Sequence, residues 1–163
     1  MIDTIHISII AVGKIKEKYL QDGIAEYEKR LGPLVKLKIL EISEERRAVH
    51  CSPAECEAAK TAEGIRICAA IPPESYGIAL DPAGELLSSE AFAQKISRWE
   101  IAGRNHLSFI IGGDRGLSGD VLKTCPLRLS LSPMTFTHQM ARMILLEQVY
   151  RAVKINRGEP YHK

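Results

Sequence analysis

The hydrophobic and polar positions along the chain form two kinds of block, which predict strands and helices in alternation. Residues 5–12 (IHISIIAV) are β-branched and almost continuously apolar, as in a strand buried on both faces. Residues 34–42 alternate apolar side chains with lysine and glutamate, which predicts a half-exposed strand. The same patterns predict further strands at 76–80, 107–111 and 127–131, and helices at 17–30, 52–70, 88–103, 120–124 and 136–154.

This alternation favours an α/β fold, with a mainly parallel sheet and helices on both faces. No repeat or linker-like stretch interrupts it, so a single domain over residues 1–163 is predicted. Ser52-Pro-Ala-Glu55 predicts a capped helix start. Asp81-Pro-Ala-Gly84 predicts a turn that ends the preceding strand, and Thr135 is the expected cap of the final helix.

The final helix is apolar over far more of its circumference than a surface helix usually is. A helix of this kind must be buried on two sides. A central position within one subunit would bury both, but it is harder to build for the last helix of a sheet protein. The pattern therefore predicts a homodimer. The residues concerned are Met140, Met143, Ile144, Leu145, Leu146, Val149, Tyr150, Ala152 and Val153.

Composition adds the expectation of a soluble, cytoplasmic protein. The chain has 163 residues, 45% of them hydrophobic and 26% charged, enough for a substantial core. Its start carries Asp3 and His6 and has no basic region typical of a signal peptide. No apolar run approaches the roughly 20 residues that cross a bilayer.

Charge is segregated along the sequence although the net charge is only +2. The balance is +2 over residues 1–40, −5 over 41–100 and +5 over 101–163. A basic C-terminal third suits a polyanionic partner, although many solvated surfaces carry such an excess.

The four cysteines do not form a zinc motif. Cys51 and Cys56 are five residues apart beside His50, which is a weak metal signal, and Cys68 and Cys125 stand alone. Reduced thiols, some of them buried, are the expectation, with no metal ion.

Two predicted strands end in loops that suit a ligand. The 107–111 strand leads into Gly112-Gly-Asp-Arg-Gly116, whose glycines suit either a tight turn at a strand end or the close approach of a ligand to the backbone. The pattern does not match G-x-G-x-x-G, so a nucleotide-dependent oxidoreductase is a distant alternative. The 127–131 strand leads into Ser132-Pro-Met-Thr135, which offers backbone groups and hydroxyls. Strand ends of a parallel sheet meet at one edge, where such folds bind ligands.

The final helix and the tail carry the remaining candidate chemistry. Glu147 and Arg151 are spaced for an ion pair on one helix face. Arg142 lies among apolar residues, where a buried arginine usually has an anionic or backbone partner. The tail, residues 157–163, combines an aromatic ring with basic groups. A frayed terminus is the default, but stacking on a base and holding a phosphate need the same residues.

Several motifs, taken together, resemble one family over essentially the whole chain. The N-terminal ones are Ala11-Val-Gly-Lys14 and Glu26-Tyr-Glu-Lys-Arg-Leu-Gly-Pro33. The C-terminal ones are Ile110-Ile-Gly-Gly113, Gly116-Leu117, Leu129-Ser-Leu-Ser132 followed by Met-Thr-Phe136, His138-Gln139, Glu147-Gln-Val-Tyr-Arg151 and Arg157-Gly-Glu-Pro-Tyr-His-Lys163. They are similar to those of the SPOUT-class large-subunit ribosomal RNA pseudouridine methyltransferases.

The resemblance implies a trefoil knot at the C-terminal end of the fold, an exception to the general absence of knots. It also implies an obligate homodimer, S-adenosylmethionine as the methyl donor, and methylation at N3 of a pseudouridine in 23S rRNA. The substrate implied is the assembled ribosome. A non-enzymatic ribosome-binding or assembly protein, using the same basic surface, is the competing interpretation.

The resemblance also implies the site residues. Cofactor contacts are expected at Leu80, Gly112, Leu131, Ser132, Pro133, Met134, Thr135 and Phe136, and residues near the target base at Arg142, Glu147, Tyr161 and His162. Glu147 and His162 are the two candidates for the base that removes a proton from the target nitrogen. The sequence departs from the family pattern at Thr137, where relatives usually have proline.

Overall fold

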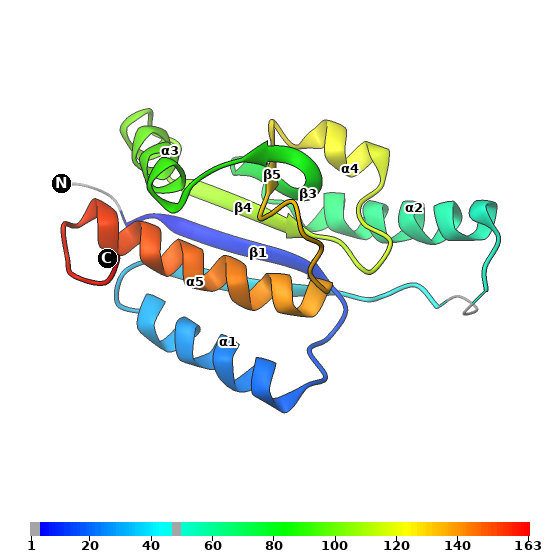
Figure 1. The fold of residues 1–163 in the computed structure, drawn as a ribbon. Helices are drawn as coiled ribbons and strands as arrows, with labels where there is room; N and C mark the ends of the chain where they lie inside the picture. Colours follow the sequence, from blue (N-terminus) through cyan, green and yellow to red (C-terminus); the bar gives the residue numbers. More distant parts are fainter. Residues whose placement is uncertain (1–3, 47–49) are drawn as a thin grey trace.

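The structure is a computed structural model that describes residues 4–46 and 50–163. Five strands and five helices alternate along the described chain, as the sequence predicts (Figure 1). The elements are β1 (His6–Val12), α1 (Lys18–Leu31), β2 (Lys36–Ile42), α2 (Pro53–Ala70), β3 (Tyr76–Leu86), α3 (Ser89–Ile101), β4 (His106–Ile111), α4 (Gly119–Thr124), β5 (Leu127–Ser130) and α5 (His138–Asn156).

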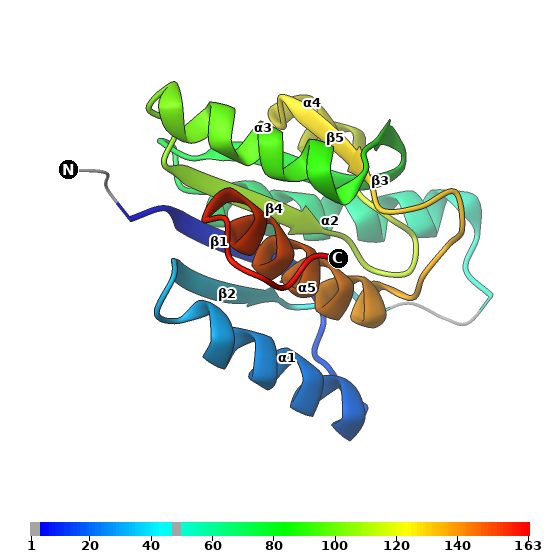
Figure 2. The ribbon, with the colours of Figure 1, turned by 60° about the vertical axis from the view of Figure 1, so that its left-hand side comes forward.

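The strands form one sheet in the order β2-β1-β4-β3-β5, and every neighbouring pair is parallel. Helices α1, α3 and α5 cover one face, and α2 and α4 cover the other (Figures 1 and 2). The predicted α/β fold is therefore confirmed. Strands β1 and β4 lie in the middle and are buried on both faces, which explains their continuous apolar sequences.

The sheet divides the core into two clusters because side chains alternate between its faces. Ile7 and Ile9 of β1 face α1, α3 and α5, where the larger cluster lies. Ile10 and Val12 face α2 and α4. The half-exposed β2 is an edge strand on which Lys36 and Lys38 are exposed, while Glu41 lies on the opposite face and contacts Arg142 of α5.

Helix α5 lies between α1 and α3, across the middle of the sheet (Figure 2). The sheet beneath α5 and the two flanking helices bury five of its nine apolar residues within one subunit: Leu145, Leu146, Val149, Ala152 and Val153. Met140, Met143, Ile144 and Tyr150 are only half-buried. The sequence analysis considered a central position harder to build for the last helix, but α5 occupies that position. The buried residues of α5 consequently give no argument for a second subunit.

Serine or threonine side chains cap four of the five described helices, and α1, which follows Glu17, has no side-chain cap. The Ser52 hydroxyl accepts a hydrogen bond from the Glu55 amide, as predicted for the start of α2. The cap predicted for α5 is wrong: it is Thr137, whose hydroxyl accepts from the Met140 amide at 3.2 Å, and not Thr135. Thr135 lies two residues too early because the loop after β5 continues to residue 137.

The Thr137 cap gives a stability prediction. We expect Thr137→Ala to lower the free energy of unfolding by about 1 kcal/mol, because the Met140 amide loses its acceptor. Thr137→Ser keeps the hydroxyl and should stay within a few tenths of the wild type. Urea unfolding followed by circular dichroism measures both. Equal losses in the two variants would contradict a capping role.

Strand β3 is longer than the sequence predicts. The expected turn at residues 81–84 lies inside it as an irregularity, because both Leu80 and Glu85 pair with Leu129 of β5. The Asp81 carboxylate accepts from the Ala83 amide, which shapes the bulge. Gly84 is required there, since a Cβ would come within 2.6 Å of the Arg128 backbone. The pairing of β3 with β5 is therefore interrupted at residues 81–84 and then resumes, so the strand does not end there.

The cysteine prediction is wrong for one pair. Cys51 and Cys56 form a disulfide, with Cα atoms 6.0 Å apart, at the N-terminal end of α2. The first turn of the helix brings the two residues together, which spacing alone did not reveal. Cys68 and Cys125 are free thiols.

In the described parts of the chain, no helix is long and apolar enough to span a bilayer. The same residues contain no cluster of His, Cys, Asp and Glu side chains suited to a metal ion.

Candidate active site

A cavity of about 570 Å³ opens at the carboxyl ends of β3, β4 and β5, and we call it the Gly112 cavity. Such an edge is where ligands bind in parallel sheets. Seven of the eight predicted cofactor residues line it, and Pro133 is the exception. The seven are Leu80, Gly112, Leu131, Ser132, Met134, Thr135 and Phe136.

The glycine turn after β4 forms one wall of the Gly112 cavity. The Gly116 amide donates to the Gly113 carbonyl at 3.0 Å, and Gly116 has a φ of +83°, which closes the turn tightly. A Cβ on Gly112 would lie 2.7 Å from the Gly116 carbonyl carbon and oxygen. Only glycine fits at residue 112, so the wall consists of backbone that a ligand can approach closely.

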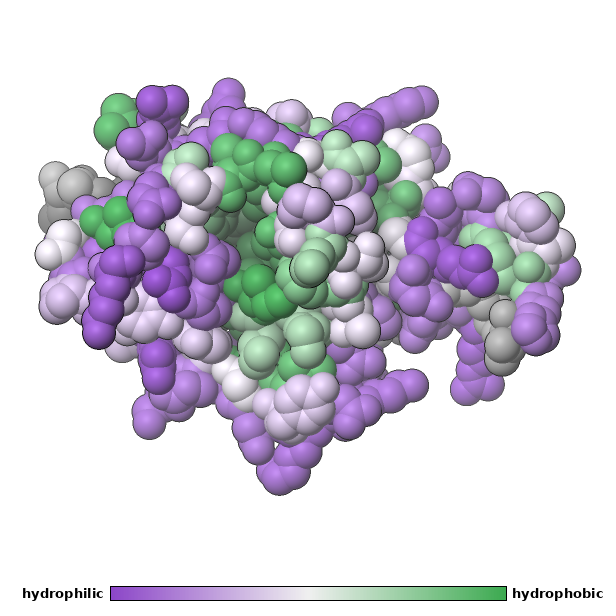
Figure 3. Space-filling model, viewed as in Figure 1, coloured by the Kyte–Doolittle hydropathy of each residue, from purple (hydrophilic) through white to green (hydrophobic). Residues whose placement is uncertain are grey.

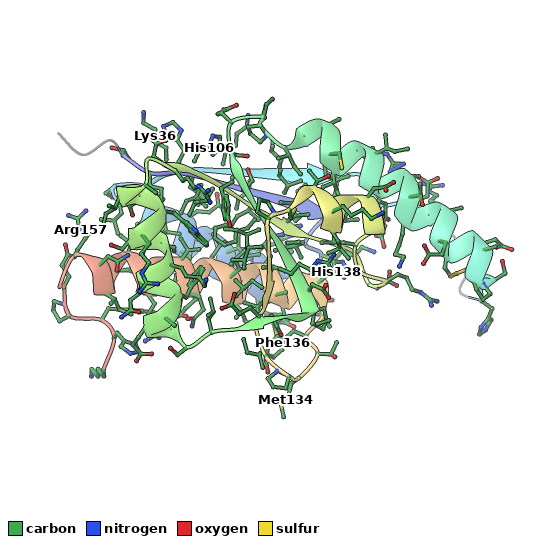
Figure 4. The ribbon with its side chains drawn as sticks, turned by 90° about the horizontal axis from the view of Figure 1, so that it is seen from above. Lys36, His106, Met134, Phe136, His138 and Arg157 are labelled. Atoms are coloured by element: carbon green, nitrogen blue, oxygen red, sulfur yellow. A yellow bond between two sulfur atoms is a disulfide. The ribbon has the colours of Figure 1, made fainter. Side chains whose placement is uncertain are left out.

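The loop between β5 and α5 forms the opposite wall. Ser132 shapes it twice, because its carbonyl accepts from the Ser130 hydroxyl and its own hydroxyl accepts from the Met134 amide, both at 3.0 Å. Met134 projects from this loop, away from the body of the protein (Figure 4), and Phe136 lines the cavity. Met134 is 77% exposed. Large apolar side chains at the rim can close over an apolar ligand without altering the backbone.

The lining of the Gly112 cavity also includes residues that the sequence analysis did not name as cofactor contacts, among them the polar side chains Asp81, His138 and Gln139. Asp81 enters through the unexpected bulge of β3. His138 and Gln139 form the first turn of α5, whose start was misplaced. The Gln139 side-chain carbonyl accepts from the Lys16 amide at 3.0 Å, so this turn also holds the loop after β1. His138 and Gln139 could have been predicted as lining residues, because they directly follow the capping Thr137.

The tail folds back along α5 and brings three of the predicted catalytic residues together (Figure 2). The Tyr161 hydroxyl donates to Glu147 at 3.0 Å. Arg151 donates to Glu147 at 2.5 Å and also contacts His162 at 3.0 Å. His162 reaches across to Glu90 at the start of α3, at 2.6 Å. We call Glu90, Glu147, Arg151, Tyr161 and His162 the tail cluster.

Both candidate bases in the tail cluster have their acceptor atoms occupied. Glu147 accepts from two nitrogens of Arg151 and from Tyr161 on one oxygen, and from Gln148 on the other. Arginine is always a donor, so His162 Nδ1 accepts from Arg151 and Nε2 carries the proton that faces Glu90. For His162 to take a proton on Nδ1, its contact with Arg151 must open, whereas Glu147 Oε2 accepts a single hydrogen bond, from Gln148.

Tyr161 is held as a neutral phenol. Burial, with further contributions from hydrogen bonds to Tyr27 and Glu147, raises the pKa of Tyr161 above its usual value. The folded state therefore binds this proton more tightly than the unfolded chain does. The resulting stabilisation is fully present below about pH 10 and is lost as the pH rises above that value. A phenolate at residue 161 is excluded as a base near neutral pH.

This shift predicts a spectroscopic result. We expect the difference between the absorbance titrations of wild type and Tyr161→Phe, read at 295 nm, to have its midpoint above the reference value of 10.0. Titration of both proteins after denaturation supplies the control, with a midpoint near 10. A native midpoint at or below 10 would contradict the buried, hydrogen-bonded phenol.

Arg142 lies apart from the other three predicted catalytic residues. It is 3% exposed and donates to Glu41 at 2.7 Å and to the Gly13 carbonyl at 3.1 Å. Its Nε makes no hydrogen bond. The expected anionic and backbone partners are both present, and they tie the first turns of α5 to β2 and to the loop after β1. In this arrangement, Arg142 is not among the residues that line the Gly112 cavity.

A family model described as a predicted SPOUT methyltransferase matches residues 5–162. The chain belongs to the SPOUT methyltransferase family. The methyltransferase family predicted from the motifs is thereby confirmed. Two relatives are named ribosomal RNA large subunit methyltransferase H: one from Carboxydothermus hydrogenoformans, 54% identical, and one from Heliobacterium modesticaldum, 51% identical. They cover 96% and 98% of this chain, and 99% of each relative is matched.

A further relative, from Methanoregula boonei, is named a putative ribosomal RNA large subunit methyltransferase H. It is 55% identical over 96% of this chain and 99% of its own length. Among solved structures, a probable methylase family protein from Haemophilus influenzae Rd KW20 has the same fold, with a TM-score of 0.52 at 14% identity. That likeness covers all of this SPOUT methyltransferase and 72% of the other chain. At that identity the comparison supports the fold alone.

Proposed function

We propose that this SPOUT methyltransferase transfers a methyl group from S-adenosylmethionine to N3 of a pseudouridine in the 23S rRNA of the assembled ribosome. The observation that carries the proposal is the Gly112 cavity, because it assembles the residues that the family resemblance assigns to the cofactor. Relatives more than 50% identical over nearly the whole chain are named as large-subunit rRNA methyltransferases.

The cavity residues fit such a cofactor. Gly112 and Gly116 present backbone without side chains on one wall of the cavity, which a flat ring can approach closely. Backbone amides and carbonyls of the 131–135 loop are suited to the edge of an adenine, and Leu80, Leu131 and Met134 to its faces. When bound, the cofactor supplies an electrophilic methyl group on a sulfonium. The protein supplies mainly position, because a displacement at that methyl needs little covalent help.

The protein must also remove the proton of the target nitrogen. Glu147 and His162 remain the candidates, and we propose that RNA binding opens the tail cluster to free one of them. Gln148 connects the tail cluster to a hollow of about 190 Å³ whose lining includes Leu131 and Phe136, and these two residues also line the Gly112 cavity. The candidate bases and the cofactor cavity therefore share a continuous surface.

The proposal includes a homodimer. Figure 3 shows a hollow lined by apolar residues in the middle of one face. The 190 Å³ hollow contains Leu87, Phe92 and Ile144 in its lining, and Met134 and Phe136 lie exposed near it. Apolar surface at the rim of a site suits a second copy of the chain. The tail of either subunit would then be able to complete the site.

Three further expectations belong to the same proposal. The chain forms a single domain over residues 1–163, it contains a trefoil knot, and it acts in the cytoplasm, where ribosomes are. The return of the chain from β5, at one edge of the sheet, to α5, near its middle, is compatible with a knotted crossing (Figure 1).

The test uses ribosomes that lack the modification. Incubation with the protein and S-adenosylmethionine should add one methyl group at N3 of a single 23S pseudouridine, mapped by mass spectrometry. Calorimetry should show binding of S-adenosylmethionine and none of NAD. A non-enzymatic assembly protein would bind the ribosome and leave its RNA unmethylated, and that result would refute the proposal.

A further inference from the structure

A second, larger cavity of about 800 Å³ lies beside the Gly112 cavity. Residues at the carboxyl ends of β1 and β2, together with the turn after β4, line it. Asp114 lines both cavities, so the two adjoin at that turn. Residues 43–46, after β2, leave the sheet toward the start of α2, which lies at the right of Figure 1. The volume is within the range of about 300–1,000 Å³ that small-ligand sites occupy.

The position of this cavity follows from the order of the strands. After β1 the chain turns to β2 on one side, and after β4 it passes to β5 on the other side. The loops at the carboxyl ends of β1 and β4 therefore diverge, and a crevice opens between them. Such a switch point is where open parallel sheets bind ligands. The Gly112 cavity lies further along the edge, so this crevice, the switch-point cavity, remains without a role in the proposed reaction.

The charges that line the switch-point cavity favour an anion. Lys14, Lys16 and Arg115 line it, are exposed, and form no ion pair with any other described residue. Two carboxylates of the lining are already neutralised, Glu41 by Arg142 and Glu45 by Arg66. Glu44 and Asp114 are the remaining carboxylates, and Asp114 also makes an interaction of its own. Arg46 adds a fourth cation to the lining.

The loop that carries the two lysines is fixed in place. Arg142 donates to the Gly13 carbonyl, Gln139 accepts from the Lys16 amide, and Gln21 donates to the Ile15 carbonyl at 2.7 Å. Two of these three contacts come from the first turns of α5, which also line the Gly112 cavity. The lysines are thus held in register with the cofactor cavity rather than on a free loop.

Resting on the proposed function, we infer that the switch-point cavity binds a phosphodiester of the rRNA strand next to the nucleotide that is methylated. The target nitrogen must meet the methyl group of a cofactor in the Gly112 cavity, so the RNA strand beside it must pass over the adjoining surface, which joins the switch-point cavity at Asp114. Lysine and arginine recognise phosphate oxygens, and such contacts fix the position of a strand without reading its sequence. Arg142 is then a positioning residue, because it acts through Gly13 and Glu41 and not on the RNA.

The test measures binding of the protein to 70S ribosomes by co-sedimentation over a series of KCl concentrations. Lys14→Ala/Lys16→Ala should weaken binding about tenfold. It should reduce the slope of log affinity against log salt by about 1 for each phosphate that the variant no longer neutralises. Lys14→Arg/Lys16→Arg should retain both values. Lys29→Ala, an exposed lysine of α1 away from the cavity, is the matched control and should match wild type.

Two readouts separate this inference from the proposed function. Affinity for S-adenosylmethionine, by calorimetry, should be unchanged within twofold in the double alanine variant, which shows that the fold and the Gly112 cavity are intact. Loss of ribosome binding in that variant supports the phosphate site even if wild type does not methylate the ribosome, a result that refutes only the proposed function. Ribosome binding and salt slope equal to those of Lys29→Ala would overturn the inference.

Discussion

Replacing Gly112 by alanine should abolish measurable binding of S-adenosylmethionine while leaving the chain folded. The added Cβ meets the Gly116 backbone at 2.7 Å, and backbone in a tight turn cannot move aside as a flexible side chain can. The turn must open and displace the wall of the cavity. We expect at least a 100-fold loss of affinity by calorimetry, and about 1–3 kcal/mol less stability.

Gly119→Ala is the matched control for this prediction. Gly119 begins α4 a few residues along the same connection, and a Cβ there meets nothing within 4 Å. The control should bind the cofactor like wild type and be equal or slightly greater in stability, because alanine favours the helix. Normal cofactor binding by Gly112→Ala would show that the cofactor does not approach this backbone, and the assigned cavity would be wrong.

Removal of Tyr161, His162 and Lys163 should have the largest effect on catalysis. It removes one candidate base and a hydrogen bond that orients the other, because Tyr161 donates to Glu147 and His162 contacts Arg151. A general base contributes about 10²–10⁴-fold, so methylation of ribosomes should fall by that factor. Affinity for S-adenosylmethionine should change less than threefold, since none of the three residues lines the Gly112 cavity.

Arg157→Ala provides the control for the truncation. Arg157 lies at the far end of α5 from His138, and its ion pair with Glu159 is solvent-exposed (Figure 4). This variant should retain wild-type turnover. The single variants Glu147→Gln and His162→Ala then assign the base. The methylation rate should rise with pH as the base loses its proton, and only the variant that lacks the base should lose this rise. Full activity of the truncated enzyme would contradict any role of the tail.

The strands and helices were predictable because each has a strong local signal. The buried strands β1 and β4 are unbroken apolar runs, and Ser52 caps α2 as its motif requires. The bulge in β3 was not predictable, because residues 81–84 have the composition of a turn and only pairing with β5 returns the chain to the ladder. Thr137 was overlooked as the cap because the loop before it contains several equally good candidates.

Part of the candidate site was also predictable from the sequence. Residues after strand ends converge by topology, so the Gly112 cavity follows from the sequence pattern and the motifs. Arg142 illustrates the limit. Its burial was predictable from apolar neighbours, but its partners Glu41 and Gly13 come from segments more than 100 residues away. The disulfide at the start of α2 was likewise invisible, because spacing alone does not tell a reduced pair from a bonded one.

The central position of α5 affects how the protein is made. The helix that fills the space between α1 and α3, and that holds the loop after β1, follows all five described strands along the chain. Until α5 has been synthesised, the apolar surface of the sheet between α1 and α3 has no helix to cover it. Native packing on that face therefore forms only after α5 is available, and a chain stopped before α5 would expose part of its core.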